Sequence, residues 1–278
     1  MKNFFEKIAY RFVNEDISIR NLLIIFIKFL KIGPYKLRLI LGAVDRPHYA
    51  YSIYHSAKLA KKLGIKKISV IEFGVAGGNG LVNIEYHVKK IEEILNINIE
   101  IYGFDTGEGL PVPKDYRDLK YHWKRGFFKM NYQDLFEKLK RSNVILGDIR
   151  QTVGVFNKKY KPAPIGAIFF DMDFYSSTKD SLKIFNSDEI LLPRIFCVFD
   201  DVIGSEVELY NDFTGERLAI NEFNFKNKFK KISEAYHLTS RPVQQSWYKQ
   251  IYIFHSLKHL QYNHFISNDN QQIKLAKR

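Results

Sequence analysis

From residue 48 onward, the hydrophobic positions of this chain switch repeatedly between helical spacing and short continuous runs. Apolar residues at helical spacing predict helices over 48–63, 81–95, 132–141 and 177–185. Between them, continuous apolar runs predict strands buried on both faces, over 66–74, 97–105, 143–148, 165–173 and 195–201. Because strands and helices alternate, the pattern predicts a parallel sheet with helices on both faces.

Two further strand-like segments, 228–239 and 246–256, follow this pattern and are separated by a turn that contains proline. They can close the sheet as an antiparallel pair. We therefore predict an α/β fold with a doubly wound, mostly parallel seven-stranded sheet and an antiparallel C-terminal strand. The predicted domain covers residues 48–266, after a basic, helical N-terminal extension over 1–47 and before a polar tail over 267–278.

The N-terminal part of the chain carries most of its positive charge. The formal net charge is +13, and residues 1–66 hold 13 Lys and Arg against 4 Asp and Glu. Such an excess suits an anionic partner. The apolar run 22–30 is too short to cross a membrane and predicts a helix. The sequence leaves open whether this helix packs on the domain, packs on a second subunit of a homo-oligomer or rests on a membrane surface.

Cysteine usage and the start of the chain indicate a reducing, cytoplasmic location. The single cysteine, Cys197, lies in an apolar run, where we expect it to be buried, and it cannot form an internal disulfide. Residues 1–20 are dotted with charges and show no secretory signal.

Acidic residues stand at the end of every predicted parallel strand. They are Glu72, Asp105, Asp148, the pair Asp171 and Asp173, and the pair Asp200 and Asp201. A single strand that ends in Asp is explained by the preference of Asp for turns, but five successive strands that end in acidic residues form a pattern. Because ligands of such sheets bind beyond the carboxyl ends of the strands, we expect the functional site there.

The glycine-rich stretch EFGVAGGNG at 72–80 follows the first strand. A dinucleotide fingerprint that begins at Gly74 would need glycine at two positions where the chain has Ala76 and Asn79. Glu72 would repel a pyrophosphate and suits an ammonium group, whereas Asp105 is placed to accept hydrogen bonds from a ribose diol. These preferences fit S-adenosylmethionine, which has an amino acid end, a ribose and no phosphate.

In these features the chain resembles the class I S-adenosylmethionine-dependent methyltransferases and, among them, the macrocin O-methyltransferase-like family. The resemblance covers roughly residues 48 to 225 and rests on EFGVAGGNG at 72–80, YGFDTGEGLP at 102–111, GDIRQTV at 147–153, DMDFYSSTKDSL at 171–182 and FDD at 199–201. It implies a Rossmann-like methyltransferase fold and metal-dependent transfer of a methyl group to a hydroxyl of a sugar or similar polyhydroxylated substrate. The chain departs from the family at Gly107, where an aromatic residue is favoured.

The residues that we expect to bind S-adenosylmethionine are Glu72, Gly74, Gly77, Gly78, Asp105 and Asp148. The aspartates of the last two parallel strands would bring up to four carboxylates together. A divalent cation is the simplest relief of their repulsion, and an oxygen-only ligand set favours Mg²⁺ or a similar hard cation. Helix capping or pairing with Arg and Lys is the alternative for some of these acids.

The resemblance implies separate roles for these aspartates. Asp171, Asp200 and Asp201 would bind the metal, and Asp173 would be the base that takes the proton of the acceptor hydroxyl. Asp171 and Asp173 would point to the same side if the extended geometry of their strand persists.

Two other functions remain open on the sequence. One is a catechol-type O-methyltransferase, and the other is a non-catalytic binding protein that retains the fold. No nucleic acid partner is expected, because basic residues are not interleaved with aromatic residues near the proposed site. His122 and Trp123 either cover the site or pack within a surface loop.

Overall fold

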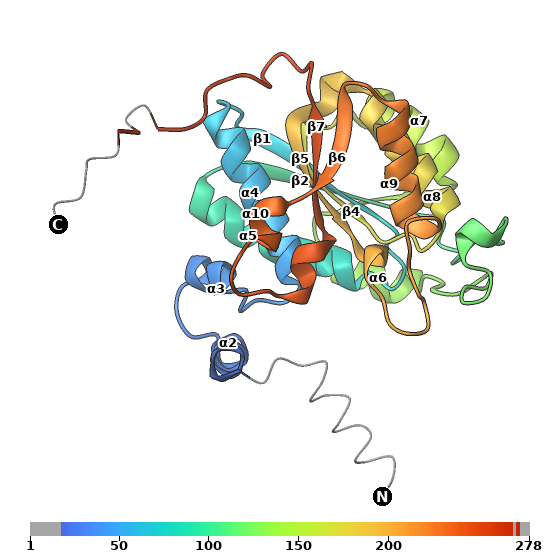
Figure 1. Cartoon of the computed structure of the whole chain (residues 1–278), viewed down its shortest axis with the longest axis horizontal. Coiled ribbons are helices and arrows are strands. Elements are labelled where there is room, and N and C mark those ends of the chain that lie inside the picture. Colours follow the sequence, from blue (N-terminus) through green and yellow to red (C-terminus); the bar gives the residue numbers. More distant parts are fainter. Residues whose placement is uncertain (1–17, 269–270, 273–278) are drawn as a thin grey trace, which may run out of the picture.

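The computed structural model describes residues 18–268 and 271–272 and consists of one seven-stranded sheet between two layers of helices (Figure 1). The strands are β1 (Lys67–Phe73), β2 (Asn98–Asp105), β3 (Asn143–Leu146), β4 (Ile165–Phe170), β5 (Leu191–Phe199), β6 (Lys230–Glu234) and β7 (Ile251–Ser256). The α-helices are α2 (Ile19–Leu30), α3 (Tyr35–Leu41), α4 (Pro47–Lys62), α5 (Asn79–Leu95), α6 (Tyr132–Lys138), α7 (Ile149–Tyr160), α8 (Tyr175–Ser181), α9 (Gly215–Lys226) and α10 (Tyr236–Thr239). Short 3-10 helices are η1 (Tyr116–Asp118), η2 (Leu182–Asn186), η3 (Asp188–Ile190), η4 (Asp200–Val202) and η5 (Ser246–Gln250).

The strand order is β3-β2-β1-β4-β5-β7-β6. Strands β1 to β5 pair in parallel, whereas β7 runs antiparallel to both β5 and β6. The predicted fold class is therefore confirmed, including the antiparallel closing pair. The order reverses between β1 and β4, so the carboxyl ends of these two strands mark the switch point at which ligands of such sheets bind.

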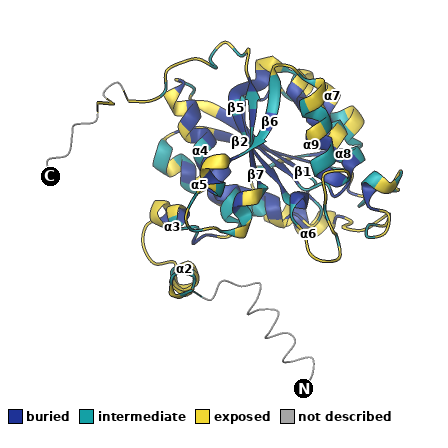
Figure 2. Cartoon of the chain, viewed as in Figure 1, coloured by how far each residue is buried: buried dark blue, intermediate teal, exposed yellow. Residues whose placement is uncertain are grey.

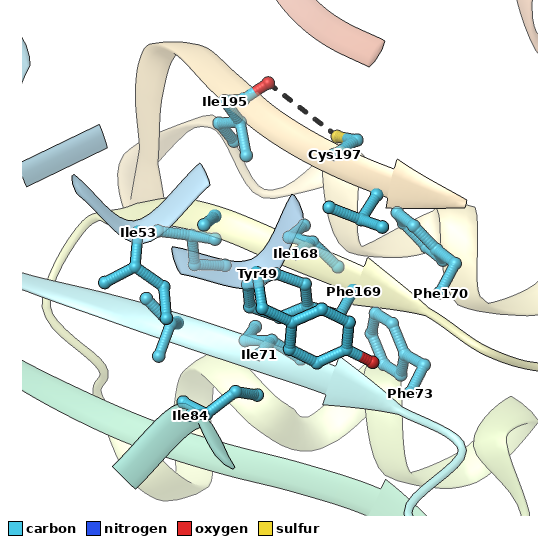
Figure 3. Packing of buried hydrophobic residues seen from close by; sticks show 14 of the residues in the cluster. Tyr49, Ile53, Ile71, Phe73, Ile84, Ile168, Phe169, Phe170, Ile195 and Cys197 are labelled. Carbon is cyan, nitrogen blue, oxygen red and sulfur yellow. Dashed lines mark hydrogen bonds between the residues drawn. The ribbon is translucent and has the colours of Figure 1, made fainter. Parts of the chain in front are cut away.

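Helices cover both faces of the sheet, as the apolar runs predict. Helices α4 and α5 lie on one face, and α7, α8 and α9 lie on the other (Figure 1). The central strands are almost wholly buried, while the helices expose their outer sides (Figure 2). On the α4 side, the ring of Tyr49 stacks on Phe169 of β4, with the ring centroids 4.2 Å apart (Figure 3). Cys197 is fully buried in β5, as expected.

Four phenylalanines lie at the same level near the carboxyl ends of the neighbouring strands β2, β1, β4 and β5. The register pairs Phe73 with Phe104 and with Phe170, and it pairs Phe170 with Phe199. Their rings are buried, with centroids 4.9 Å apart for Phe73 and Phe104, 5.4 Å for Phe73 and Phe170, and 4.4 Å for Phe170 and Phe199. This phenylalanine row forms an apolar layer directly beneath the strand ends.

The local differences from the sequence prediction lie at element ends. The strand predicted over 165–173 ends at Phe170, because the chain turns there. The helix predicted over 177–185 begins earlier, at Tyr175, and tightens into the 3-10 helix η2. The strand predicted over 228–239 is β6 followed by the helix α10, and the strand predicted over 246–256 is the 3-10 helix η5 followed by β7. Helix α3 was not predicted.

The apolar run 22–30 forms part of α2, which confirms the predicted helix, but no residue of α2 is buried. The next helix, α3, is anchored in the core by Tyr35 and Leu39. None of the described helices is long and apolar enough to cross a membrane. Residues 1–17 of the predicted extension and most of the predicted tail lie outside the described residues.

Candidate functional site

A cavity of about 640 Å³ lies at the carboxyl ends of the parallel strands. It is lined by residues from the segments that follow all five parallel strands. All ten predicted site residues are among them: Glu72, Gly74, Gly77, Gly78, Asp105, Asp148, Asp171, Asp173, Asp200 and Asp201. The structure thus brings the predicted residues together at one place.

The register of the sheet explains why these residues meet. The residue that follows each member of the phenylalanine row is Gly74, Asp105, Asp171 or Asp200. Because the four phenylalanines are aligned, these four residues lie at a common level at the carboxyl edge of the sheet. The acids therefore lie between an apolar layer and the cavity.

The glycines after β1 mainly allow close packing within the protein. Gly74 has a φ of +88°, and a Cβ atom there would lie 1.8 Å from the main-chain oxygen of Asp171. A Cβ atom on Gly80 would lie 1.8 Å from Oε1 of Glu72. Gly77 differs from both, since no atom lies within 4 Å of the position that its Cβ would take. Of these three glycines, Gly77 is the one that leaves room for a ligand beside the main chain.

Glu72 is 1% exposed and faces α4 and α5 from the end of β1. Its Oε1 accepts a hydrogen bond of 3.0 Å from the hydroxyl of Tyr49, whereas its Oε2 has no hydrogen-bond partner among the described residues. Burial raises its pKa to about 8, although the Tyr49 hydrogen bond and the charge of Arg46 oppose the shift. A buried carboxylate with one unused oxygen is suited to a cationic group of a ligand.

Asp105 and Asp148 are already engaged by their own surroundings. Oδ2 of Asp105 accepts hydrogen bonds from the main-chain nitrogens of Val75 (2.9 Å) and Ala76 (2.8 Å), and Oδ1 accepts one from Gly107 (2.6 Å). Asp105 therefore braces the glycine-rich turn, while lone pairs remain for a ligand. Asp148 caps α7 and forms an ion pair with Arg150. The side chain of Asp148, which was predicted to bind the cofactor, thus has local partners in the described residues.

Asp171 and Asp173 do not share an extended backbone. The strand ends at Phe170, and Asp173 has a φ of +58°, which is the left-handed region that non-glycine residues seldom adopt. The expectation that strand geometry persists through Asp173 is therefore wrong. The turn directs the main-chain nitrogen of Asp173 at Oδ2 of Asp201, 2.8 Å away, and both Asp171 and Asp173 still line the cavity.

Hydrogen bonds hold the two aspartates that follow β5. Oδ1 of Asp201 accepts a bond of 2.7 Å from the hydroxyl of Tyr210, and Oδ1 of Asp200 accepts one of 2.8 Å from Nε2 of Gln250. The main-chain nitrogen of Asp201 donates to Oε2 of Glu216 over 3.0 Å. These bonds fix the orientation of both carboxylates.

The pKa values of the clustered acids are all raised. Burial is the largest cause at each position, and the neighbouring carboxylates add to it for Asp171, Asp173 and Asp201. The pKa of Asp173 rises to about 8 and that of Asp201 to about 6, whereas the pKa of Asp171 lies well above its ordinary range. Burial also raises the pKa of Asp200, and Arg46 and Gln250 oppose this rise because they stabilise its charged form.

Two charged residues near the cluster escaped the sequence prediction. Arg46 precedes α4, lines the cavity and interacts electrostatically with Glu72, Asp171 and Asp200. Glu216, in the first turn of α9, is fully buried, and its Oε1 has no partner among the described residues. Glu216 lies in the segment TGERLAINEF at 214–223, which resembles a helix of the family but to which the sequence assigned no chemistry, and Arg46 is marked only by the proline that follows it.

Two loops that contribute to the lining of the cavity contact each other. Trp123 and Phe128, from the segment after β2, line the cavity with their ring centroids 5.7 Å apart. The hydroxyl of Tyr121 donates to the main-chain oxygen of Glu208, and Nε2 of His122 lies 3.7 Å from a carboxylate oxygen of the same residue. Trp123 thus lines the cavity, whereas His122 does not line it and packs against the neighbouring loop.

The type of side chain at the site suits a metal ion, although the side chains are not arranged as a ready-made metal-binding group among the described residues. Among residues 18–268 and 271–272, no three His, Cys, Asp or Glu side chains are arranged as a metal-binding group. The donor set nevertheless suits a hard cation, since it consists of carboxylate oxygens whose mutual repulsion a cation would relieve. Neither His255, which contacts the hydroxyl of Tyr262, nor Cys197, which is buried, adds a softer ligand.

Comparison with known proteins supports the fold. One solved structure with a similar fold is CalS11, a calicheamicin methyltransferase, which is 18% identical and superposes with a TM-score of 0.53 over 91% of each chain. Another is the O-methyltransferase NovP, at 12% identity and a TM-score of 0.51, over 75% of this chain and 79% of that chain. No protein-family model and no curated protein matches the sequence. At these identities the similarity shows a Rossmann-like methyltransferase fold.

Proposed function

We propose that this chain, which has the fold of class I methyltransferases, transfers a methyl group from S-adenosylmethionine to a hydroxyl of a sugar or similar polyhydroxylated acceptor, with the aid of a divalent cation such as Mg²⁺. The observation that carries the proposal is the meeting of ten predicted residues, from five strand ends, on one cavity. Its volume of about 640 Å³ suits a ligand of this size, because small-molecule sites span ~300–1,000 Å³.

The surroundings of Glu72 support S-adenosylmethionine over a dinucleotide. Its unpartnered Oε2 suits the ammonium group of the amino acid end, and a pyrophosphate placed there would be repelled. The open space at Gly77 admits a ligand beside the main chain. Asp105 has lone pairs left for the ribose hydroxyls, and Asp148 lines the same cavity.

The acids after β4 and β5 support transfer to oxygen. When bound, S-adenosylmethionine supplies an electrophilic methyl group, and a divalent cation supplies the charge that lowers the pKa of a nearby hydroxyl. Asp171, Asp200 and Asp201 would hold the cation. Asp173 would take the hydroxyl proton while the acceptor oxygen forms the new carbon–oxygen bond and the electron pair of the broken sulfur–carbon bond passes to sulfur.

Calorimetry tests the cofactor first. The protein is titrated with S-adenosylmethionine, with its demethylated product and with NAD, and we expect heat of binding from the first two alone. Binding of NAD without binding of S-adenosylmethionine would contradict the proposal. No binding of any of the three would favour a non-catalytic binding protein.

A transfer assay then separates the acceptor classes. The aromatic walls formed by Trp123 and Phe128 would also suit a catechol, so the catechol-type alternative is tested beside the first. Labelled S-adenosylmethionine and Mg²⁺ are incubated with sugar nucleotides, glycan fractions or catechols. We expect the label on the carbohydrate, whereas a methylated catechol alone would assign the enzyme to the second class.

A further inference from the structure

Helices α2 and α3 expose an unusually apolar surface. Phe29 is 81% exposed, Ile40 is 63% exposed, and Leu22, Leu23, Ile25 and Phe26 are each more than half exposed. Figure 2 shows α2 at the margin of the molecule, beyond α3. These six side chains are called the α2–α3 surface below. Exposed apolar patches of this kind mark sites of contact with a protein or a membrane.

The α2–α3 surface is held to the domain without being covered by it. Nζ of Lys28 lies 2.9 Å from Oδ1 of Asp45, just before α4, and Tyr35 and Leu39 fix α3 in the core. The packing of α2 as a buried helix of the domain, one of the three arrangements left open by the sequence, is thus wrong for the described residues. A membrane and a second copy of the chain remain.

Charge decides between these two occupants. Residues 18–41 contain five basic residues and no acidic one. A second copy placed on the surface would bring like charges together, whereas an anionic lipid surface attracts them. We propose that the α2–α3 surface docks on an anionic membrane, with its apolar side chains at the level of the acyl boundary and its basic side chains among the lipid phosphates.

The dimensions of the segment agree with docking on the surface. Helix α2 has 12 residues, fewer than the ~20 that a membrane-spanning helix needs, so it would lie in the interface. Five residues after α3, Arg46 lines the cavity. Docking would therefore hold the segment that carries Arg46, and with it this side of the cavity, near the membrane.

Binding to vesicles tests this proposal independently of any activity. The full chain is mixed with vesicles of phosphatidylcholine alone or of phosphatidylcholine with phosphatidylglycerol, and the bound fraction is measured by flotation. We expect binding to the anionic vesicles that weakens with added salt. Lys31→Gln should lower the affinity about fivefold, because a basic residue near an anionic surface contributes on the order of 1 kcal/mol.

Two exposed phenylalanines provide a matched pair of variants. Phe29→Ser removes an apolar group that would be buried in the lipid, so the affinity should fall about tenfold or more. Phe225→Ser removes a ring that is 91% exposed on α9, far along the chain from the α2–α3 surface, and should leave binding unchanged. Circular dichroism verifies that both variants are folded.

Three outcomes would overturn the proposal. The first is that the parent chain does not bind anionic vesicles, and the second is that both phenylalanine variants weaken binding equally. The third is a dimer in light scattering that Phe29→Ser dissociates, together with no vesicle binding, which would assign the surface to a second copy. None of these results depends on methyl transfer, so failure here is distinguishable from failure of the proposed function.

Discussion

Replacement of Glu72 by Gln tests the electrostatic cost of the acid beneath the cavity. Burial raises the pKa of Glu72 from an ordinary value of 4.5 to about 8. Between these two values the folded chain keeps a proton that the unfolded chain has lost. The free energy of unfolding therefore falls as the pH rises, by ~1.4 kcal/mol per pH unit from this one group.

The expected magnitude follows from the width of this interval. From about pH 5 to about pH 8, Glu72 should remove on the order of 4 kcal/mol from the stability of the parent chain. Gln keeps the size of the side chain and an oxygen that accepts from Tyr49, but it cannot ionise. The parent should therefore lose stability relative to Glu72→Gln as the pH rises. The other raised acids affect both proteins, so the difference between the two curves isolates Glu72.

Urea unfolding followed by circular dichroism measures this difference at a series of pH values, with chelator present and S-adenosylmethionine absent. Glu100→Gln is the matched control. Burial of Glu100 is outweighed by hydrogen bonds from Ala163 and Lys67, so its pKa is lowered. Its stabilising contribution is already complete above pH 4.5 and disappears only at lower pH, as the carboxylate is protonated. The Glu100→Gln curve should stay parallel to the parent curve over the whole range.

A constant offset between Glu72→Gln and the parent would refute the reasoning. Such a result would mean that Glu72 is ionised in the folded chain at all of these pH values. Burial would then not control its charge, and the electrostatic cost that a cationic ligand is expected to relieve at this position would be absent.

Further predictions concern the ligands. Gly77→Ala should weaken S-adenosylmethionine binding in calorimetry without lowering thermal stability, because the added Cβ would enter the cavity. Gly154→Ala is the control, since the space around its Cβ position is equally open but lies on α7. It should leave binding unchanged and stabilise the helix by ~1 kcal/mol. Asp200→Asn should raise the Mg²⁺ concentration needed for half-maximal activity, and full turnover in excess chelator would exclude a metal role. Asp173→Asn should lower turnover ~10²–10⁴-fold with nearly unchanged cofactor affinity, and it should regain part of the loss at higher pH. A defect in Asp173→Asn that added Mg²⁺ fully cures would make this residue a ligand rather than the base.

The position of the site was predictable from the sequence because it depends on strand ends. Continuous apolar runs locate the five parallel strands, and the parallel arrangement brings Glu72, Asp105, Asp148, Asp171 and Asp200 to one edge whatever the exact register. The glycine spacing after β1 already argued against a dinucleotide. These inferences require only the spacing of hydrophobic residues along the chain and the identity of the residues that follow each apolar run.

The detail of the site was less predictable because it depends on contacts between distant segments. The left-handed turn at Asp173 is stabilised by a bond to Asp201, 28 residues later, and no local signal in the sequence indicates it. Whether Asp105 is free or braces the glycine-rich turn depends on how β1 and β2 align. Glu216 becomes part of the cluster only because α9 packs its first turn against η4.

The charge of the cavity contrasts with the charge of the chain. Nine acidic residues and three basic ones line the cavity, whereas the whole chain carries a net charge of +13. The phenylalanine row prevents water from solvating the acids from below, so the folded protein compensates them by protonation, by hydrogen bonds such as that of Tyr210, and by Arg46. Each of these is a partial solution, since raised pKa values persist in spite of them. A ligand that carries an ammonium group, a sulfonium group or a divalent cation supplies the missing charge, and its binding must release protons from these acids. The same electrostatic cost that weakens the empty fold at high pH thereby becomes the driving force for binding cationic ligands.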